Sequence, residues 1–251
     1  MTRFTFYPHD RAERLALYAA EYTFTQDEPT PWTPLRKSLR DCRACLVTTA
    51  GLRLKTQHEF RADRVHGSAE FREISLFAHR RDLAFDFTNY DPREAEKDLN
   101  VIVPVDRLKE LVDEHALAGV HETFFSFYGL CDDVNALKAS AREAARRAQC
   151  DVAFLVPANL VCNQTVSIVS REFEHAGIST ATLVTVREIA AQVKVPRPLF
   201  INHPFGRTLG KAGDKAGQRG VLDEMVKALR THDRPARMTD LPMKWTEMLE
   251  D

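Results

Sequence analysis

Cys162 is the residue of this sequence whose type and position are best suited to covalent chemistry. It lies in the segment VPANLVCNQTVSIVSREFEHAG (156–177), which runs from an apolar strand into an amphipathic helix. At the first turn of a helix, unpaired backbone N–H groups and the helix dipole favour a thiolate. Cysteine also packs in protein cores much as alanine does. Position alone therefore leaves both a nucleophile and a buried structural residue open.

Polar residues on two segments extend this candidate site. Gln164 and Thr165 follow Cys162 in the expected first helical turn, where they can bind a substrate by hydrogen bonds. Thr48 and Thr49 end an expected buried strand, RACLVTTAG (43–51). Ligands of parallel sheets bind beyond the carboxyl ends of the strands, so we expect all four residues to line a substrate site.

A glycine-rich, basic segment, HPFGRTLGKAGDKAGQRG (203–220), precedes the last long helix. Its backbone and fixed positive charges suit a carboxylate or a phosphate, although a mobile surface loop has the same composition. Arg207 is the favoured anion contact because its planar guanidinium matches a carboxylate. Gly206, Lys211 and His203 complete the expected substrate-binding set. The segment has no GK[ST] motif, and no GxGxxG follows a strand, so we expect no cofactor.

The other cysteines suggest no metal or redox site. Cys42 and Cys45 have the spacing of a redox or zinc pair, but no second pair and no histidine at ligand spacing accompany them. Cys131 and Cys150 flank elements and are expected to be structural. An odd total of five argues against a disulfide framework, and we expect reduced thiols and no bound metal.

Hydrophobic periodicity predicts an α/β fold. From residue 132 onward, helices and strands alternate regularly, which indicates a parallel sheet covered on both faces. A less regular α/β unit precedes it. We therefore expect two Rossmann-like or flavodoxin-like α/β/α lobes with mainly parallel sheets, in a racemase-like two-lobed arrangement. The expected division is an N-terminal helix and extended arm (1–40), a first lobe (41–131), and a second lobe with a C-terminal helix and tail (132–251).

Composition excludes several classes of partner. With 35 basic and 36 acidic residues the net charge is -1, which offers no electrostatic footprint for nucleic acid. No apolar stretch approaches the length of a membrane span, and the N-terminus lacks the apolar core of a signal peptide. We expect a cytoplasmic protein that binds neither nucleic acid nor membrane, with a homodimer as the default assembly.

Several segments resemble the selenoprotein B family of glycine, sarcosine, betaine and D-proline reductases. The resemblance covers roughly residues 30–230, and the length fits the shorter, D-proline-reductase-like members. VCNQT with its flanking strand and helix is the most specific match. The matching segments are PWTPLRKSL (31–39), LVTTAGL (46–52), NYDPREAEKDLNVIVPVDRLKELV (89–112), FSFYG (125–129), DVAFLVPANLVCNQTVSIVSREFEHAGISTATL (151–183) and HPFGRTLG (203–210).

This resemblance implies a thiol mechanism with one component missing. In the family, a selenocysteine or cysteine lies three residues before the retained cysteine. It attacks the substrate carbon next to nitrogen or another leaving group, and the second thiol completes the redox cycle. Here Asn159 stands at the first position and Cys162 at the second, while Phe87 and Asn89 stand where the family tends to carry histidines. Asn159 can donate a hydrogen bond to the substrate or to a Cys162 thiolate but cannot be the nucleophile.

Three functions follow as alternatives. The first is a reductase-like protein that uses Cys162, with Asn159 beside it, on a small amino acid or related carboxylate. Its lone thiol would need an external thiol or a partner subunit for regeneration. The second is a non-catalytic homologue or subunit that binds a small acid. The third follows from CNQT, which resembles the CNT turn of cofactor-independent aspartate/glutamate-type racemases, where two thiols face one carbon.

Overall fold

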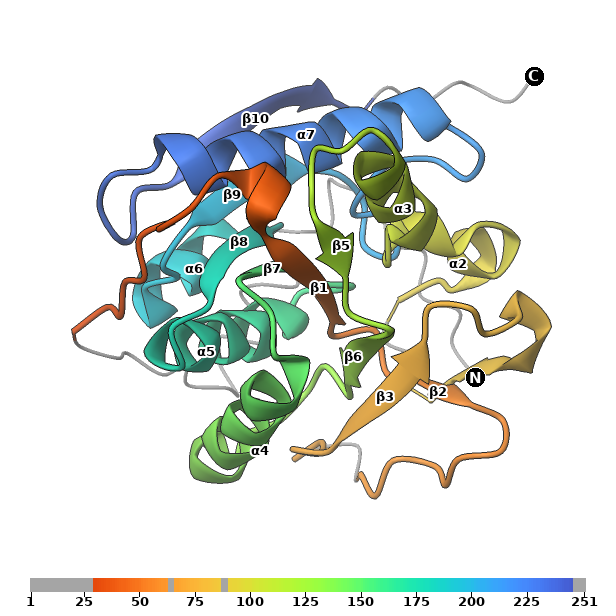
Figure 1. The fold of residues 1–251 in the computed structure, drawn as a ribbon. Helices are drawn as coiled ribbons and strands as arrows, with labels where there is room; N and C mark the ends of the chain where they lie inside the picture. Colours follow the sequence, from red (N-terminus) through yellow and green to blue (C-terminus); the bar gives the residue numbers. More distant parts are fainter. Residues whose placement is uncertain (1–28, 63–65, 87–89, 246–251) are drawn as a thin grey trace.

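The computed structural model describes residues 29–62, 66–86 and 90–245 (Figure 1). The expected N-terminal helix lies outside these residues. No helix in the described part of the chain is both long and apolar enough to cross a membrane.

A mainly parallel sheet forms the centre of the fold. Its strand order is β10-β9-β8-β7-β1-β6-β3, and β5 pairs with β1 beside β6. All neighbouring pairs are parallel except β3 with β6. The strands are β1 (Arg43–Thr48), β3 (Phe71–Ser75), β5 (Gly119–Val120), β6 (Thr123–Phe127), β7 (Val152–Val156), β8 (Ser179–Val184), β9 (Pro198–Asn202) and β10 (Thr239–Lys244). The expected α/β class with a mainly parallel sheet is confirmed.

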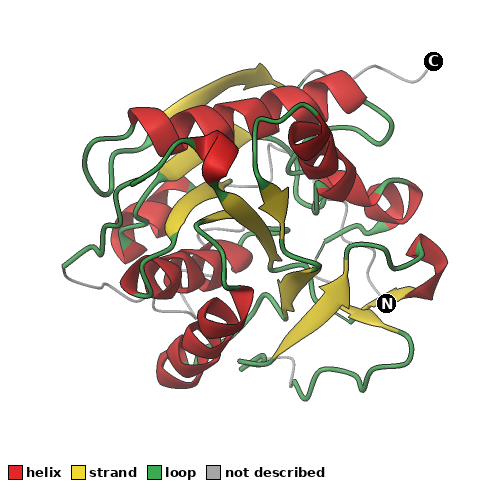
Figure 2. Ribbon diagram, viewed as in Figure 1, coloured by secondary structure: helices red, strands yellow, loops and turns green. Residues whose placement is uncertain are grey.

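Helices lie on both sides of this sheet (Figure 2). Helix α5 packs between α4 and α6, while α3 packs against α7 (Figure 1). The helices are α2 (Arg93–Lys97), α3 (Val105–Asp113), α4 (Val134–Ala148), α5 (Cys162–His175), α6 (Arg187–Val193) and α7 (Lys215–Thr231), with short 3-10 turns η2 (Leu39–Asp41), η3 (Arg80–Asp82) and η4 (Leu99–Val101). Every residue of β7 and β8 is buried, as is usual for central strands of a parallel sheet with both faces covered.

The two expected lobes share one sheet. Strand β1 comes from the first expected lobe and β7 from the second, and five consecutive residue pairs join them, from Ala44 with Val152 to Thr48 with Val156. A separate two-stranded ribbon, β2 (Leu52–Leu54) with β4 (Leu83–Phe85), belongs to the first part alone. The division of the chain at residue 131 stays a prediction.

The loop part of the glycine-rich segment (203–220) is shorter than expected. Helix α7 already begins at Lys215, so Gly217 and Gly220 lie within the helix. The Asp214 carboxylate caps the helix by accepting a hydrogen bond from the Gly217 N–H at 2.9 Å. A Cβ at position 217 would lie 2.3 Å from that carboxylate. The cap explains why a helix begins among residues with low helix propensity.

The proline-rich segment before η2 is held in place by a buried ion pair. Arg197 and Glu174 form this pair with both side chains fully buried. Arg197 also donates to the Thr33 carbonyl at 2.6 Å, and its guanidinium stacks 3.7 Å from the centre of the Trp32 ring. The Thr33 hydroxyl donates to the Glu174 carbonyl at 2.7 Å. The arm is therefore fixed to α5 and β9 through one charged centre.

Removing one member of this pair should destabilise the whole fold. Arg197→Met keeps much of the side-chain volume but leaves the Glu174 carboxylate buried without its cation, which typically costs about 3–5 kcal/mol. We expect a large loss in the free energy of unfolding, measured by urea denaturation. Arg146→Met is the matched control, because Arg146 pairs with Glu143 on an exposed helix face. Equal effects of the two substitutions would show that the buried pair has no special role.

Candidate active site

Cys162 is the first residue of α5 and follows β7 through a short turn. Its side chain is fully buried at the carboxyl edge of the sheet. The thiol donates a hydrogen bond to the Thr49 carbonyl at 3.1 Å, and the Cys162 N–H donates to Asn159 Oδ1, also at 3.1 Å. Three of the expected site residues are thus in direct contact, brought together by the ends of β1 and β7.

Backbone N–H groups at the start of α5, which could favour a thiolate, already form hydrogen bonds within the turn before the helix. The N–H groups of Asn163 and Gln164 donate to the carbonyls of Leu160 and Val161 at 3.1 and 3.0 Å. Asn163 also pins this turn to the end of β8, because its Oδ1 accepts from the Thr185 N–H at 2.8 Å. Its role was missed in the sequence because an asparagine beside a candidate cysteine looks like a substrate contact.

Burial outweighs the groups that favour a thiolate. It raises the pKa of the Cys162 thiol to about 11, while the contact with Thr49 and the N–H groups of Ala158, Asn159 and Cys162 itself act in the opposite direction. Of the two roles that position alone left open for Cys162, the raised pKa favours a protonated, buried thiol in the absence of ligand. Desolvation disfavours the charged form of this buried thiol.

Two buried hydroxyls at the end of β1 lack partners. The Oγ1 atoms of Thr48 and Thr49 form no hydrogen bond within the described residues, and both side chains are fully buried. Buried polar atoms almost always bind protein, water or ligand. The Thr49 carbonyl accepts from the Cys162 thiol, so at least one of these two residues lies directly beside it.

The first half of the glycine-rich segment covers the turn that leads to Cys162. The Gly206 N–H donates to the Ala158 carbonyl at 2.7 Å, and the Thr208 hydroxyl donates to the Pro157 carbonyl at 2.5 Å. Gly206 has a φ of +79°, and a Cβ there would lie 2.7 Å from the Asp91 carbonyl oxygen. The role of Gly206 is therefore a close backbone approach that only glycine allows.

The cationic residues of this segment gather around Trp245, which sequence reasoning did not select. Trp245 lies 5.4 Å from the His203 ring, between ring centres, and the charged ends of Arg207 and Lys211 lie 5.7 and 5.5 Å from its ring centre. Within the described residues, Arg207 has no carboxylate at ion-pair distance. In the sequence, Trp245 stands out only as a single tryptophan in a polar C-terminal stretch. No local pattern connects it to Arg207 and Lys211, which lie some forty positions earlier.

Thr165 and Gln164 are buried in the first turns of α5. The Thr165 hydroxyl donates to the Gly129 carbonyl at 2.8 Å, so it ties α5 to the end of β6. That Gln164 and Thr165 contact a substrate stays a prediction.

Tyr90 is a site residue that the sequence analysis did not single out. It is buried, its hydroxyl donates to the Ala50 carbonyl at 2.9 Å, and its ring would contact any side chain at position 206. Burial raises the pKa of Tyr90 well above its usual range, and the proximity of Cys162 adds to that effect. Tyr90 belongs to the NYDP motif, which lies in one of the segments that resemble the selenoprotein B family. That resemblance could have pointed to Tyr90.

The other cysteines make contacts elsewhere. All five are thiols, with no disulfide between them. The Cys45 and Cys150 sulfurs face each other, Cys131 donates to the Asp133 carbonyl, and Cys42 donates to the Ser38 carbonyl. None of these contacts brings a second thiol to Cys162, as a two-thiol racemase would need.

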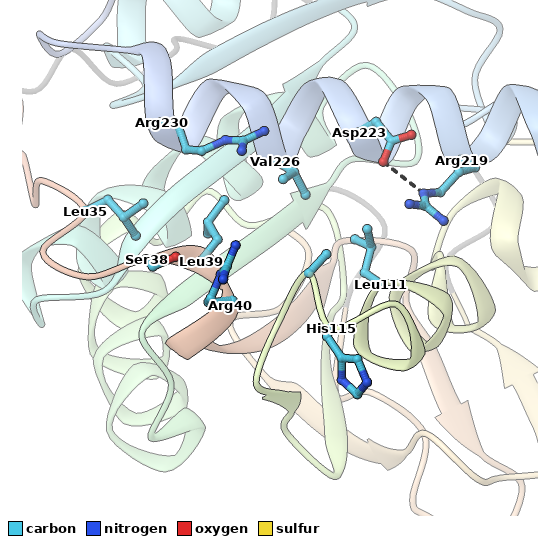
Figure 3. A pocket seen from close by; sticks show the side chains of 11 residues that line it. Leu35, Ser38, Leu39, Arg40, Leu111, His115, Arg219, Asp223, Val226 and Arg230 are labelled. Carbon is cyan, nitrogen blue, oxygen red and sulfur yellow. Dashed lines mark hydrogen bonds and ion pairs between the residues drawn. The ribbon is translucent and has the colours of Figure 1, made fainter.

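A pocket of about 380 Å³ lies at the opposite edge of the sheet, near the start of β1 (Figure 3). Cys162 does not line it. The lining residues come from η2, the end of α3 and α7: Leu35, Ser38, Leu39, Arg40, Leu111, His115, Ala116, Arg219, Asp223, Val226 and Arg230.

Comparison with known proteins gives a consistent result. A family model described as glycine/sarcosine/betaine reductase selenoprotein B matches residues 16–153, more than half of the chain. D-proline reductase subunit gamma of Acetoanaerobium sticklandii is 26% identical over 223 residues, which are 86% of this chain and 90% of that relative. No solved structure matches.

Longer relatives match over part of their length. Glycine reductase complex component B subunit gamma of Peptoclostridium litorale is 30% identical over 57% of this chain and 34% of its own length. Sarcosine reductase complex component B subunit beta of Peptoclostridium acidaminophilum is 26% identical over 85% of this chain and 51% of its own length. This chain belongs to the glycine/sarcosine/betaine reductase selenoprotein B family.

Proposed function

We propose that this chain works within a reductase-type assembly, where it binds a small amino acid or related carboxylate and presents Cys162 as the reacting thiol. The observation that carries the proposal is the contact of the Cys162 thiol with Thr49, at a strand end where the buried hydroxyls of Thr48 and Thr49 lack partners among the described residues. The relatives are named as subunits or components of D-proline, glycine and sarcosine reductases, which supports the same class of substrate.

Each part of the substrate has a candidate partner. Arg207 and Lys211 supply positive charge for a carboxylate, and Trp245 holds both cations on one aromatic surface. The hydroxyls of Thr48 and Thr49 offer hydrogen bonds to the atoms nearer the thiol. Because the segment around Gly206 covers the turn before Cys162, substrate entry requires this cover to move.

The proposed reaction is a reductive cleavage in two steps. The Cys162 sulfur attacks the carbon that carries nitrogen, so that a C–S bond forms, the C–N bond breaks and the amine leaves with a proton. A second thiol then attacks the Cys162 sulfur. An S–S bond forms, the C–S electron pair passes to carbon, and carbon takes up a proton. Two thiols are oxidised to one disulfide in this scheme.

The second thiol must come from outside the Asn159–Cys162 pair. Asn159 occupies the position where the family carries selenocysteine or cysteine, and an amide cannot supply electrons. We therefore assign the resolving thiol to a partner subunit or a small-molecule thiol. Asn159 instead holds the Cys162 N–H through its side-chain oxygen.

Activation of Cys162 in this proposal depends on a positive charge that the ligand brings to the thiol. A neighbouring cation lowers the pKa of a thiol, because it stabilises the thiolate. The ammonium group of a bound amino acid would provide this charge and would raise the thiolate fraction only when substrate is present.

A non-catalytic subunit that binds a small acid is the second candidate. The raised pKa of Cys162 and the presence of Asn159 at the preceding family position both favour it. The two candidates differ in whether ligand binding makes the thiol reactive.

Alkylation of Cys162 separates these candidates. In the isolated chain we expect the alkylation rate to keep rising above pH 9, because the thiol loses its proton only near pH 11. Reductive function predicts that a saturating ligand, chosen from D-proline, glycine, sarcosine and betaine, accelerates the reaction at pH 7. The rate is read peptide by peptide by mass spectrometry.

Cys131 is the internal control, since burial also raises its pKa to about 11. Its rate should not respond to ligand. If ligands bind but leave the Cys162 rate unchanged, the non-catalytic subunit is supported. A rate plateau well below pH 9 without ligand would contradict the structure-based account of the thiol.

The Thr48→Val and Thr49→Val variants test the binding site. Each replaces an unpartnered buried hydroxyl with a methyl group, so we expect the unliganded protein to be equally or more stable. Ligand affinity should fall about tenfold for each variant, through the loss of one hydrogen bond. Both quantities follow from thermal melting with and without ligand.

Thr182→Val is the matched control for these variants. The Thr182 hydroxyl is buried in β8 and donates to the Ser170 hydroxyl at 2.9 Å. We expect this variant to lose stability while its ligand-induced shift is retained. An unchanged ligand response in both Thr48→Val and Thr49→Val would overturn the assignment of the site.

A further inference from the structure

Two thiols that the proposed mechanism does not use lie in contact near the start of β1. The Cys45 and Cys150 sulfurs are 3.1 Å apart, although the residues are 105 positions apart in the chain. Cys45 is fully buried in β1, and Cys150 is half-buried in the connection between α4 and β7. This contact is separate from Cys162, whose sulfur faces Thr49.

Backbone pairing fixes the approach of the two thiols. Cys45 is in register with Ala153 in the β1–β7 ladder. Just outside the ladder, the Asp151 N–H donates to the Arg43 carbonyl at 2.8 Å, and the Arg43 N–H donates to the Asp151 carboxylate at 2.8 Å. Cys150 is thus held beside β1 on a segment that is bound to it at the adjoining residue. A bond between the sulfurs requires little backbone movement.

We propose that Cys45 and Cys150 form a reversible intramolecular disulfide when the chain meets a small-molecule disulfide such as oxidised glutathione. The half-buried Cys150 sulfur attacks the small disulfide, forming a mixed disulfide and releasing one glutathione thiolate. Cys45 gives up its proton and attacks the Cys150 sulfur, forming the protein disulfide and releasing the second glutathione. The protein thiols lose two electrons and two protons, and the small disulfide is reduced to two thiols.

This pairing differs from the one that sequence spacing suggests. Cys42 and Cys45 have the CxxC spacing, but the Cys42 thiol donates to the Ser38 carbonyl at 3.4 Å and is fully buried. Cys45 meets Cys150 instead. An oxidant therefore enters at Cys150, which is the member of the pair that solvent can reach.

The bond would join the two strands whose opposite ends hold the candidate active site. Thr49 follows β1, and the turn to Cys162 follows β7. A covalent link at the start of these strands constrains the unfolded chain over a long loop and stabilises the ladder between them. The inference does not depend on the proposed reductive function.

The test uses the reduced full-length chain, incubated with oxidised glutathione and then alkylated in denaturant. Peptides are analysed without reduction. Trypsin places Cys45 on peptide 44–53 and Cys42 on peptide 41–43, but leaves Cys150 and Cys162 together on peptide 148–171. Chymotrypsin is therefore added to cut after Phe154. We expect a Cys45–Cys150 linked peptide as the main oxidised product, and a melting temperature raised by about 5 to 10 °C.

Dithiothreitol should reverse both effects, and Cys150→Ser should abolish them. Cys131→Ser is the matched control and should retain them. The wild-type peptide map decides the matter even if a variant folds poorly. A glutathione adduct that stays on Cys150, a Cys42–Cys45 link, or an unmodified Cys45 would each overturn the proposal.

Discussion

The pairing of β1 with β7 is the constraint on which the rest of the structure depends. Five residue pairs in register join strands that are more than a hundred positions apart. This β1–β7 ladder joins the two halves of the chain into one sheet. It also positions the residues that lie at the two ends of these strands. Thr49 and the turn to Cys162 meet beyond its carboxyl end, and Cys45 meets Cys150 near its beginning.

The candidate active site combines polar groups with complete burial. The Gly206 segment covers the turn before Cys162 and lies against Tyr90, and burial raises the pKa of the thiol. At a buried site, a charge introduced by a ligand acts strongly on neighbouring groups. The same burial that disfavours the thiolate would amplify the effect of a bound ammonium group.

Periodicity and strand chemistry were sufficient to predict most elements of the fold. The expected strand at 43–51 is present but ends at residue 48, and the expected helix after β7 begins at Cys162. Local propensity failed at Lys215, where the Asp214 cap begins a helix among glycines. The placement of Cys162 at the carboxyl edge followed from topology rules for parallel sheets.

The rest of the site depends on contacts between distant segments. Trp245 meets Arg207, and Cys45 meets Cys150, through folding that no local pattern encodes. The protonation state of Cys162 stayed open in the sequence for the same reason. A helix position suggests a low pKa, but the depth of burial is known only once Thr49, Tyr90 and the turn at Ala158 are in place.

The buried centre around Arg197 has a consequence for how the chain folds during synthesis. Thr33 and Trp32 leave the ribosome long before Arg197, which follows 164 residues after Thr33. Until β9 is made, the arm has no cation on which to stack and Glu174 has no counter-ion. Such long-range closure slows folding and leaves strand edges exposed in the meantime. The nascent chain therefore completes its native core only when most of its sequence has emerged.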